Sequence, residues 1–322
     1  MIIKEAMHLQ KHEHAKKISQ CLQLAILLEA SAHKPGNISV VINFEKTRYE
    51  HFLASAIAAG PSFEFSAKRG IEISEGKIDV TQAEIGLLIK NCVSDINAWQ
   101  HGGNTLLGTA ILLSPIGVAA GMTCDKEQAL DIQELRENLK LIVESTTPED
   151  AVNVYEAIRT ANPSGLGKVS DLDVNDPNSV DKIRKDRTSL YEVFKLASGY
   201  DLVCSEWVNN YPITFDLAYS SLRRQFEENK TLDSVIVLTF LEVLAEHPDT
   251  LIARKTSCEE ARRISLTAKE VLKLGIESSR GKQSLSRFDE ELRRSSNLLN
   301  PGTTADILSA ALSLCVLGGY RP

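Results

Sequence analysis

The sequence predicts an all-α protein that folds as one globular multi-helix domain. In most segments apolar residues recur at steps of three and four, which is the spacing of one face of an α-helix. Helix-capping residues stand in front of several of these segments. No repeat with a period of roughly 33 to 47 residues is visible, and this excludes an α-solenoid. We therefore expect roughly 12 to 14 helices in a single domain over residues 1–322.

The first element is a long helix over residues 12–32, because Ile18, Leu22, Ala25 and Ala32 fall on one stripe. Comparable patterns, taken in chain order, cover residues 48–67, 104–121, 128–145, 180–198, 211–228, 231–246, 279–297 and 303–318. Glycine, proline and asparagine separate them, as expected for helix ends.

Three further helices are predicted from their N-terminal caps. Thr147 precedes a proline and two acidic residues, so it is expected to cap a helix whose first turn interacts well with the helix dipole. Ser257 with Glu260 has the spacing of a capping box, and so does Thr81 with Glu84. Each spacing predicts a helix start.

Two segments need a separate interpretation. Residues 70–80 alternate apolar and polar side chains around a Glu-Gly pair, so the pattern predicts a small β-hairpin there. Residues 106–122 are the longest apolar run, but Thr109, Ser114 and Pro115 interrupt it. A buried core helix is therefore favoured over a membrane span.

The charge balance bears on partners. The chain has 36 basic and 43 acidic residues and a formal net charge of −7, which gives no general reason to bind nucleic acid or an anionic membrane. A phosphate-bearing ligand must therefore meet a local basic cluster. The composition, 43% hydrophobic and 25% charged residues, is that of a soluble globular protein.

The cysteines and the N-terminus indicate the compartment. No Cys-x-x-Cys pair occurs among Cys21, Cys92, Cys124, Cys204, Cys258 and Cys315, so reduced, mostly buried thiols are expected. Polar residues near Met1 argue against a secretory signal, and a cytoplasmic location follows.

Candidate functional residues gather at the helix breaks. Lys34, Pro35 and Gly36 follow the first long helix, where a lysine beside a flexible turn can bind phosphate. Asn104 and Thr105 follow a Gly-Gly pair at the start of an apolar helix, a place that stabilises an anion. A simple helix stop and a helix cap are the structural alternatives for these two clusters.

Acidic residues form a second group of candidates. Asp171, Asp173 and Asp176 lie in the long irregular segment 161–178, which can hold a hard cation such as Mg²⁺ or be a solvated turn. Asp201 and Glu206 follow, with helix capping as the structural alternative for Asp201.

Two further clusters lie in the C-terminal quarter. One combines Asp249 with Arg254 and Lys255, which places an acid close to two cations. The other is the segment from Asn300 to Asp306, where Gly302 and a threonine precede an apolar helix and have the spacing of a cap and its partner. Each cluster alone is a weak signal.

Taken together and in order, these motifs resemble the triphosphoribosyl-dephospho-CoA synthase family. The residues that carry the resemblance are Pro35-Gly36, Ser55-Ala56, Asn104-Thr105 with Gly108, Tyr200-Asp201 with Glu206, Asp249-Thr250 with Arg254, and Pro301-Gly302 with Ala305-Asp306. The resemblance covers residues 20–318 and implies an all-α enzyme. Such an enzyme joins C1 of the ATP ribose to the 2′-hydroxyl of dephospho-CoA and releases adenine.

The chain also departs from the family pattern. Leu106-Leu107 replaces a His-Lys pair, Leu251 replaces an asparagine, and an Arg-Gly-Glu stretch is absent, with the segment around Asp171 in its place. With these changes the chain resembles a divergent, archaeal-like branch of the family. We therefore expect the Asp171 segment to influence the choice of acceptor.

The resemblance groups the candidates by role. Asp201, Glu206 and Asp249 are expected to be catalytic, and Asp201, Asp249, Asp171 and Asp173 to bind Mg²⁺. The nucleotide is expected to bind Lys34, Pro35, Gly36, Asn104, Thr105, Arg254, Lys255, Gly302 and Asp306.

ATP and an acceptor such as dephospho-CoA are the expected small-molecule partners. Whether the chain forms homo-oligomers stays open. Two other functions also stay open at this point. One is an Mg-ATP-dependent ligase or phosphoryl transferase on the same helical scaffold, and the other is a non-catalytic nucleotide-binding protein.

Overall fold

The computed structural model describes the whole chain except residues 1, 124, 127–128, 168, 229 and 295–296. Its helices in the N-terminal half are α1 (Ile2–Ser31), α2 (Tyr49–Ala58), α3 (Gly60–Ser74), α4 (Ile85–Trp99), α5 (Leu107–Met122), α6 (Ile132–Glu144) and α7 (Pro148–Ala161). Those in the C-terminal half are α8 (Asn178–Asp186), α9 (Leu190–Ala197), α10 (Leu202–Val208), α11 (Ser220–Glu227), α12 (Leu232–Glu246), α13 (Thr250–Lys255), α14 (Cys258–Lys273), α15 (Ser279–Arg293) and α16 (Gly302–Leu317). The predicted all-α class is confirmed.

Short irregular elements complete the fold. A 3₁₀ turn (Val80–Gln82) precedes α4, and a π-helix (Ile213–Tyr219) runs directly into α11. The strands β1 (Asp125–Lys126) and β2 (Ala129–Leu130) pair antiparallel. The labelled helices exceed the expected 12 to 14 because short ones such as α10 and α13, with seven and six residues, are too brief to show a periodic pattern.

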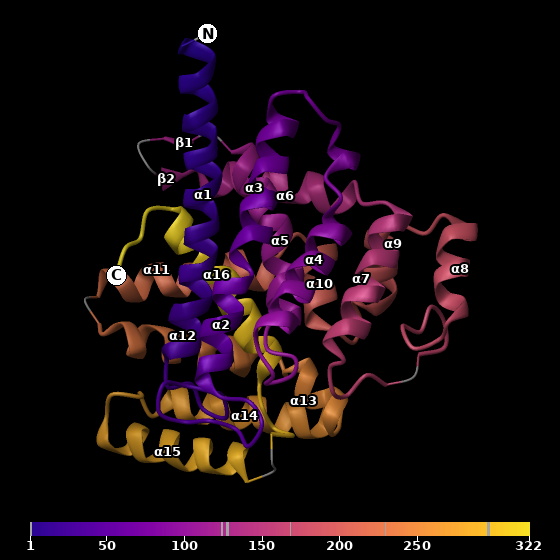
Figure 1. Cartoon of the computed structure of the whole chain (residues 1–322). Coiled ribbons are helices and arrows are strands. Elements are labelled where there is room, and N and C mark those ends of the chain that lie inside the picture. The colour runs from indigo at the N-terminus through magenta and orange to yellow at the C-terminus, as the bar shows by residue number, and fades with distance from the viewer. Residues whose placement is uncertain (1, 124, 127–128, 168, 229, 295–296) are drawn as a thin grey trace.

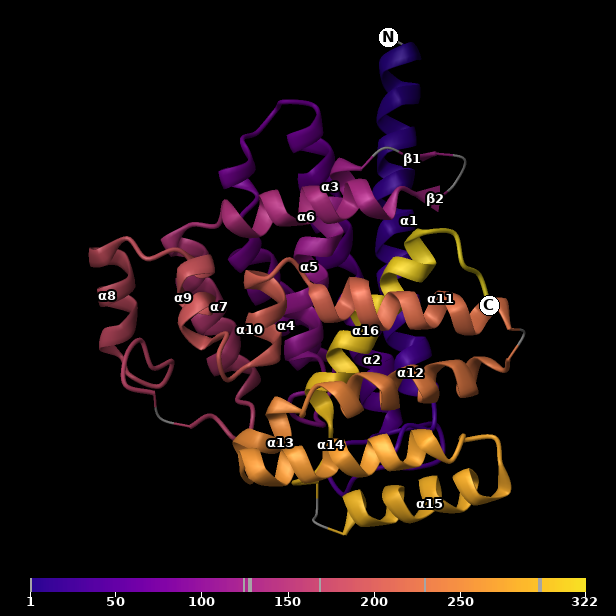
Figure 2. The ribbon, with the colours of Figure 1, turned by 180° about the vertical axis from the view of Figure 1, so that it is seen from behind.

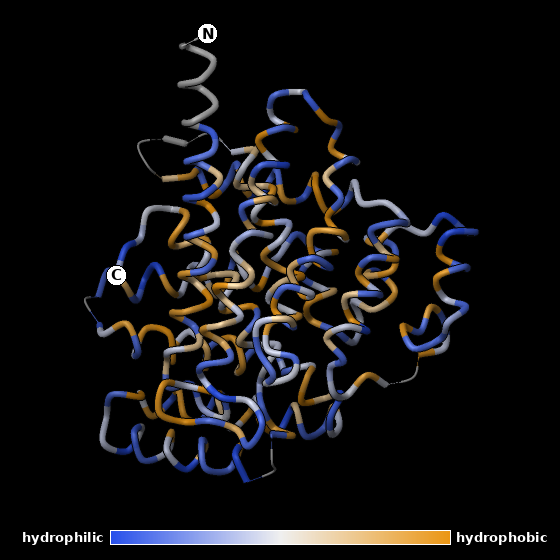
Figure 3. The backbone as a smooth tube through the Cα atoms, in the orientation of Figure 1, coloured by the Kyte–Doolittle hydropathy of each residue, from blue (hydrophilic) through white to orange (hydrophobic). Residues whose placement is uncertain are grey.

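Two apolar helices, α5 and α16, occupy the centre of the molecule (Figures 1 and 2). Nearly every residue of both is buried, and apart from Asp306 their polar members are small serines and threonines. α5 packs against α3, α6 and α16, while α16 packs against α1 and the π-helix. Colouring by hydropathy shows the apolar segments inside and the polar ones outside (Figure 3). The expected core helix at residues 106–122 is therefore confirmed as α5.

The β-hairpin expected at residues 70–80 is wrong. Helix α3 continues to Ser74, and a turn leads from there into the 3₁₀ segment. The helix prevails because α3 packs tightly on α5 at Gly70, where an added Cβ would lie 1.9 Å from the carbonyl oxygen of Val118. Burial of this helix pair outweighs the local alternation of side chains.

The predicted caps have mixed outcomes. The Thr147 hydroxyl accepts a hydrogen bond from the Asp150 N–H, and the Ser257 hydroxyl accepts one from the Glu260 N–H, so both of these helix starts are confirmed. The predicted Thr81 cap is wrong, because Asp79 caps the 3₁₀ turn and α4 begins after a left-handed Glu84. Among the described helices, none has the length and hydropathy of a membrane span.

The thiols agree with the prediction within the described residues. Cys21, Cys92, Cys204 and Cys315 are buried, Cys258 is exposed, and none of these five forms a disulfide. Cys124 lies outside the described residues.

Candidate active site

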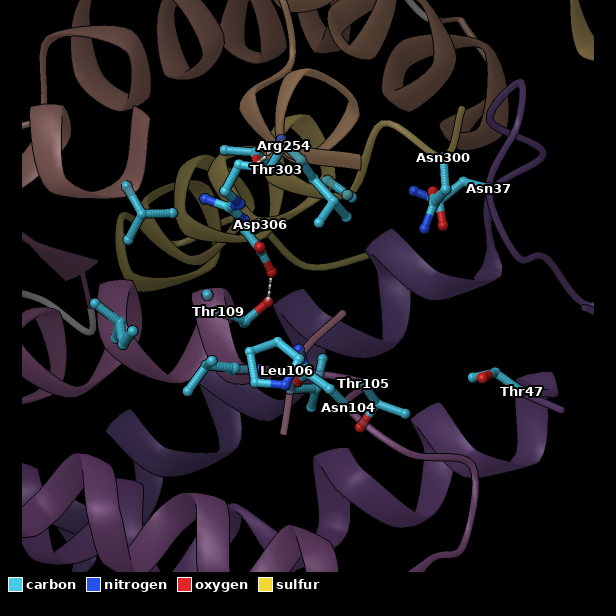
Figure 4. Close-up of a pocket in the computed structure, with 18 of the residues that line it drawn as sticks. Asn37, Thr47, Asn104, Thr105, Leu106, Thr109, Arg254, Asn300, Thr303 and Asp306 are labelled. Atoms are coloured by element: carbon cyan, nitrogen blue, oxygen red, sulfur yellow. Dashed lines mark hydrogen bonds between the residues drawn. The ribbon is translucent and has the colours of Figure 1, made fainter. Parts of the chain in front are cut away.

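A cavity opens where the first turns of α5 and α16 lie close to each other. Its wall also includes the loop between α1 and α2, the segment after α7, and the starts of α10 and α13. The cavity, its mouth and the open space before it together cover about 1180 Å³. Figure 4 shows side chains from these separate segments directed toward a common space.

The structure brings part of the predicted site together. The predicted residues on the cavity wall are Asn104, Thr105, Asp201, Arg254, Gly302 and Asp306. The predicted residues that do not line it are Lys34, Pro35, Gly36, Asp171, Asp173, Glu206, Asp249 and Lys255.

Asp306 stands at the centre of the cavity. The Thr109 hydroxyl donates a hydrogen bond to Asp306 Oδ1 at 2.6 Å (Figure 4). The other oxygen, Oδ2, faces Gly108, where an added Cβ would lie only 2.1 Å away. Burial, together with the nearby carboxylates of Glu29 and Asp249, raises the pKa of Asp306 to about 7. Such a carboxyl group can take up or release a proton near neutral pH.

Glu29 is a cavity residue that the sequence reasoning missed. It lies on α1, lines the cavity, and pairs with the fully buried Lys34 ammonium at 3.1 Å. Burial raises the pKa of Glu29, and the charge of Lys34 opposes that rise. The available signal was a single acidic residue within the apolar run from Leu27 to Ala30. Lys34 thus supports a carboxylate on the wall instead of lining the cavity itself.

The Pro35-Gly36 turn fixes the loop that follows it. Gly36 has a φ of +70°, and its N–H donates to Asp289 Oδ1 at 2.7 Å. An added Cβ would lie 2.7 Å from the side chain of Leu292. Glycine is therefore required by both the left-handed backbone and the tight packing against α15.

Asp201 and Arg254 form an ion pair on the cavity wall. Asp201 Oδ1 accepts from the N–H groups of Val203 and Cys204 and so caps α10, while Oδ2 pairs with the Arg254 guanidinium. Asp201 therefore has both its predicted site position and its alternative role as a cap. The Asn104 side chain accepts from the Leu107 N–H at 3.1 Å, at the start of α5.

Asp249 is fully buried and joins α13 to α16. Its Oδ1 accepts from the N–H groups of Leu251 and Ile252, and its Oδ2 accepts from both the N–H and the hydroxyl of Thr304 at 2.8 Å. Burial raises the pKa of Asp249 despite these bonds. The role that the geometry shows is to hold the helix starts beside the cavity.

The substitution Asp249→Asn is expected to destabilise the protein by about 1 to 3 kcal/mol, because one of the two saturated oxygens becomes an NH₂ group facing N–H donors. Thermal and urea unfolding measure this loss. A stable variant whose turnover nevertheless falls 10²-fold would instead return Asp249 to the catalytic role predicted from the sequence.

Glu206 also has a structural position. Both of its oxygens accept backbone N–H groups of the π-helix, from Ile213 at 2.9 Å and from Thr214 at 2.8 Å. Burial raises the pKa of Glu206 to about 7. The side chain does not line the cavity, so its predicted catalytic role stays a prediction.

Lys255 and the acidic segment surround the site. Lys255 donates to the carbonyl oxygen of Asn297 at 3.1 Å. Asp171 is exposed and pairs with Lys182, which lowers the pKa of Asp171, while Asp173 accepts backbone N–H groups within its own turn. Of this segment, Pro163 and Leu166 reach the cavity wall.

The four predicted metal ligands are therefore not brought together. Asp201 lines the cavity, Asp249 is buried behind it, and Asp171 and Asp173 lie in the outer segment. In the part of the chain that the structure describes, no group of three or more His, Cys, Asp or Glu side chains could hold a metal ion.

Fold and cavity together define an all-helical enzyme with a carboxylate-rich site between helix N-termini. Residues 15–321 match the CitG family, described as ATP:dephospho-CoA triphosphoribosyl transferase. The chain belongs to this family, and it is an ATP-using transferase.

Among solved structures, the chain is similar to a candidate triphosphoribosyl-dephospho-CoA synthase from Archaeoglobus fulgidus. The two share 23% identity with a TM-score of 0.60, over 84% of this chain and 100% of the other. This likeness supports the fold. The comparison with curated proteins found no match.

Proposed function

We propose that the chain transfers the triphosphoribosyl group of Mg-ATP to the 2′-hydroxyl of dephospho-CoA in this cavity, with Asp306 as general base. The carrying observation is the position of Asp306, a partly buried carboxyl group with a pKa of about 7 on the wall of the cavity. A base with this pKa is half ionised at neutral pH and is matched to proton transfer there.

The chemistry accounts for every atom. The acceptor oxygen forms a bond to C1 of the ribose while the bond from C1 to N9 of adenine breaks. The hydroxyl proton passes to Asp306, and adenine leaves with the electron pair of the broken bond and takes up a proton. Because positive charge develops on the ribose, a fixed carboxylate nearby stabilises the transition state. Glu29, held by Lys34, has this position in our proposal.

The triphosphate is proposed to lie near Arg254 and the first turns of α5 and α16. Helix N-termini stabilise anions, and a guanidinium binds phosphate in a bidentate manner. Among the described ionisable residues on the wall, however, Arg254 is the one cation, against Glu29, Asp201 and Asp306. Arg254 is already paired with Asp201, so free ATP would meet no unpaired cation among these residues.

This charge balance supports Mg²⁺ as a companion of ATP. Mg²⁺ in nucleotide sites uses phosphate oxygens, waters and one or two carboxylates, so a preformed cluster is not required. Asp201, the predicted ligand on the cavity wall, would hold it. When bound, the ion would neutralise phosphate charge, while Arg254 orients the triphosphate.

Incubation with ATP, Mg²⁺ and dephospho-CoA is expected to release adenine in equal amount to a product heavier by one triphosphoribosyl group. Chromatography with mass spectrometry measures both products, and excess chelator should stop both. ADP or AMP in place of adenine would point to a ligase or phosphoryl transferase. Unchanged ATP with every acceptor would indicate a protein without catalysis. Adenine release with a different acceptor would overturn only the choice of dephospho-CoA.

A further inference from the structure

Three asparagine amides line the active-site cavity and retain buried polar atoms. Asn37 comes from the loop after α1, and Asn297 and Asn300 precede α16. Among the described residues, Asn37 Nδ2, Asn297 Oδ1 and Asn300 Oδ1 are buried and have no hydrogen-bond partner. In Figure 4 the amides of Asn37 and Asn300 occupy the same corner of the view. A buried polar atom without a partner costs about 1 to 3 kcal/mol, so these atoms point to a ligand.

Asn37 is held with its NH₂ group directed to the cavity. Its side chain is 94% buried, since 6% of the residue is exposed, and Oδ1 accepts the Ile38 N–H at 2.8 Å. This bond fixes which end of the amide is oxygen, and Nδ2 is left as an unused donor. The backbone is fixed as well, because the Asn37 carbonyl accepts from Arg293 at 2.7 Å. The Gly36 turn and α15 thus hold the Asn37 Nδ2 donor at the cavity wall.

The other two amides are held through their backbones. The Asn300 carbonyl accepts the Gly302 N–H at 2.9 Å, and the Asn297 carbonyl accepts from Lys255 at 3.1 Å. Turning either amide by 180° exchanges its oxygen and nitrogen, so each side chain offers one buried polar atom in either orientation. The cluster therefore provides one fixed donor and two adaptable groups.

The chemistry of this cluster favours a ligand that carries both donors and acceptors. A metal ion cannot accept a hydrogen bond from Asn37 Nδ2. A phosphate group offers acceptors but no donor, so it pairs with all three amides only when Asn297 and Asn300 both present nitrogen. The edge of adenine carries ring-nitrogen acceptors beside an amino donor, which is the complement of paired amides. Phe44 and Leu251 line the same cavity and offer apolar contacts to a flat base.

We propose that Asn37, Asn297 and Asn300 form the subsite that recognises the adenine base. This inference rests on the proposed function, and adenine occurs in both ATP and dephospho-CoA. If the subsite binds the base of ATP, Asn37 also donates a hydrogen bond to the leaving group. If it binds the base of dephospho-CoA, the amides position the acceptor.

Calorimetry with the full chain separates these cases. The probes are Mg-ATP against Mg-ITP, whose base carries an oxygen in place of the amino group, and dephospho-CoA against 4′-phosphopantetheine, which lacks the whole AMP unit. The variants are Asn37→Asp, which keeps the acceptor for the Ile38 N–H but removes the donor, and Asn300→Ala. Asn153→Ala, on α7 and outside this cavity, is the matched control.

We expect the wild type and the control to prefer Mg-ATP over Mg-ITP by at least about 10-fold, or dephospho-CoA over 4′-phosphopantetheine by as much. Both site variants should reduce that preference to within about threefold. The quantity compared is the ratio of two affinities measured with the same variant. The charge added by Asn37→Asp acts on Mg-ATP and Mg-ITP alike, so it cancels in their ratio. The pair that loses its preference identifies which adenine is bound.

Two results would overturn the subsite. The first is a wild-type preference that both variants keep, and the second is a wild type that binds the compared ligands equally well. A wild type that binds neither Mg-ATP nor dephospho-CoA would instead contradict the proposed function. Thermal unfolding of each variant, measured beforehand, separates a lost contact from a lost fold.

Discussion

The substitution Asp306→Asn is expected to lower turnover by at least about 10²-fold while raising stability at pH 8. Asparagine keeps the size of the side chain and can still accept the hydrogen bond from Thr109, but it cannot take the hydroxyl proton. Loss of a general base typically costs about 10²- to 10⁴-fold. Steady-state release of adenine measures the first effect, and unfolding at several pH values measures the second.

The sign of the stability effect follows from the pKa of Asp306, which burial raises from 3.8 to about 7. Between these values the folded protein binds a proton that the unfolded chain has released. The free energy of unfolding of the wild type therefore falls as the pH rises from about 4 to 7, and it levels off above that range. An asparagine does not titrate. The variant should match the wild type near pH 4 and exceed it by a few kcal/mol at pH 8.

Activity should follow the same ionisation in the wild type. If the ionised carboxylate is the base, kcat/KM rises with pH and reaches a plateau above about 7. Thr109→Val removes a hydrogen bond that lowers this pKa, so the rise should move to higher pH. A pH profile that stays in place in Thr109→Val, together with near-normal turnover in Asp306→Asn, would remove Asp306 from the proton transfer.

Helical periodicity predicted most of the fold because a buried stripe leaves a pattern at steps of three and four. The pattern failed where packing between helices decides the outcome. Gly70 stands at the start of the predicted hairpin, yet it allows α3 to approach α5 closely. The short helix α13 was not predicted either, because its start depends on Asp249, which the sequence pattern indicates as a catalytic acid.

The site was predicted in part for a related reason. Clusters at helix breaks found Asn104, Arg254 and Asp306, because the first turns of α5, α13 and α16 meet at the cavity. An acid that caps a helix and an acid that faces a ligand have the same sequence signature, so Glu206 could not be separated from Asp306. Glu29 lies inside a helix, where no break draws attention to it.

The other large effect is expected from Lys34→Met, which removes the partner of Glu29. The Lys34 side chain is fully buried; it pairs with Glu29 Oε1 at 3.1 Å and also donates to the carbonyl oxygens of Glu29 and Ala32. Methionine fills a similar volume but leaves a buried carboxyl group uncompensated. Breaking a buried pair in this way costs about 3 to 5 kcal/mol. Urea unfolding at pH 8 measures the loss.

The double variant Lys34→Met with Glu29→Gln shows whether that loss comes from the unpaired charge. Burial raises the pKa of Glu29, and Lys34 opposes this rise. In the single variant the pKa should therefore rise further, and the loss of stability should be smaller at low pH, where Glu29 is protonated, and larger as the pH increases. The double variant should recover much of the stability and lose this pH dependence, because no charge is left to bury. Because Glu29 lines the cavity and is replaced in the double variant, that variant should still have low turnover.

A double variant that is no more stable than Lys34→Met would mean that the lysine acts through its packing and its carbonyl hydrogen bonds, and that the carboxylate does not depend on it.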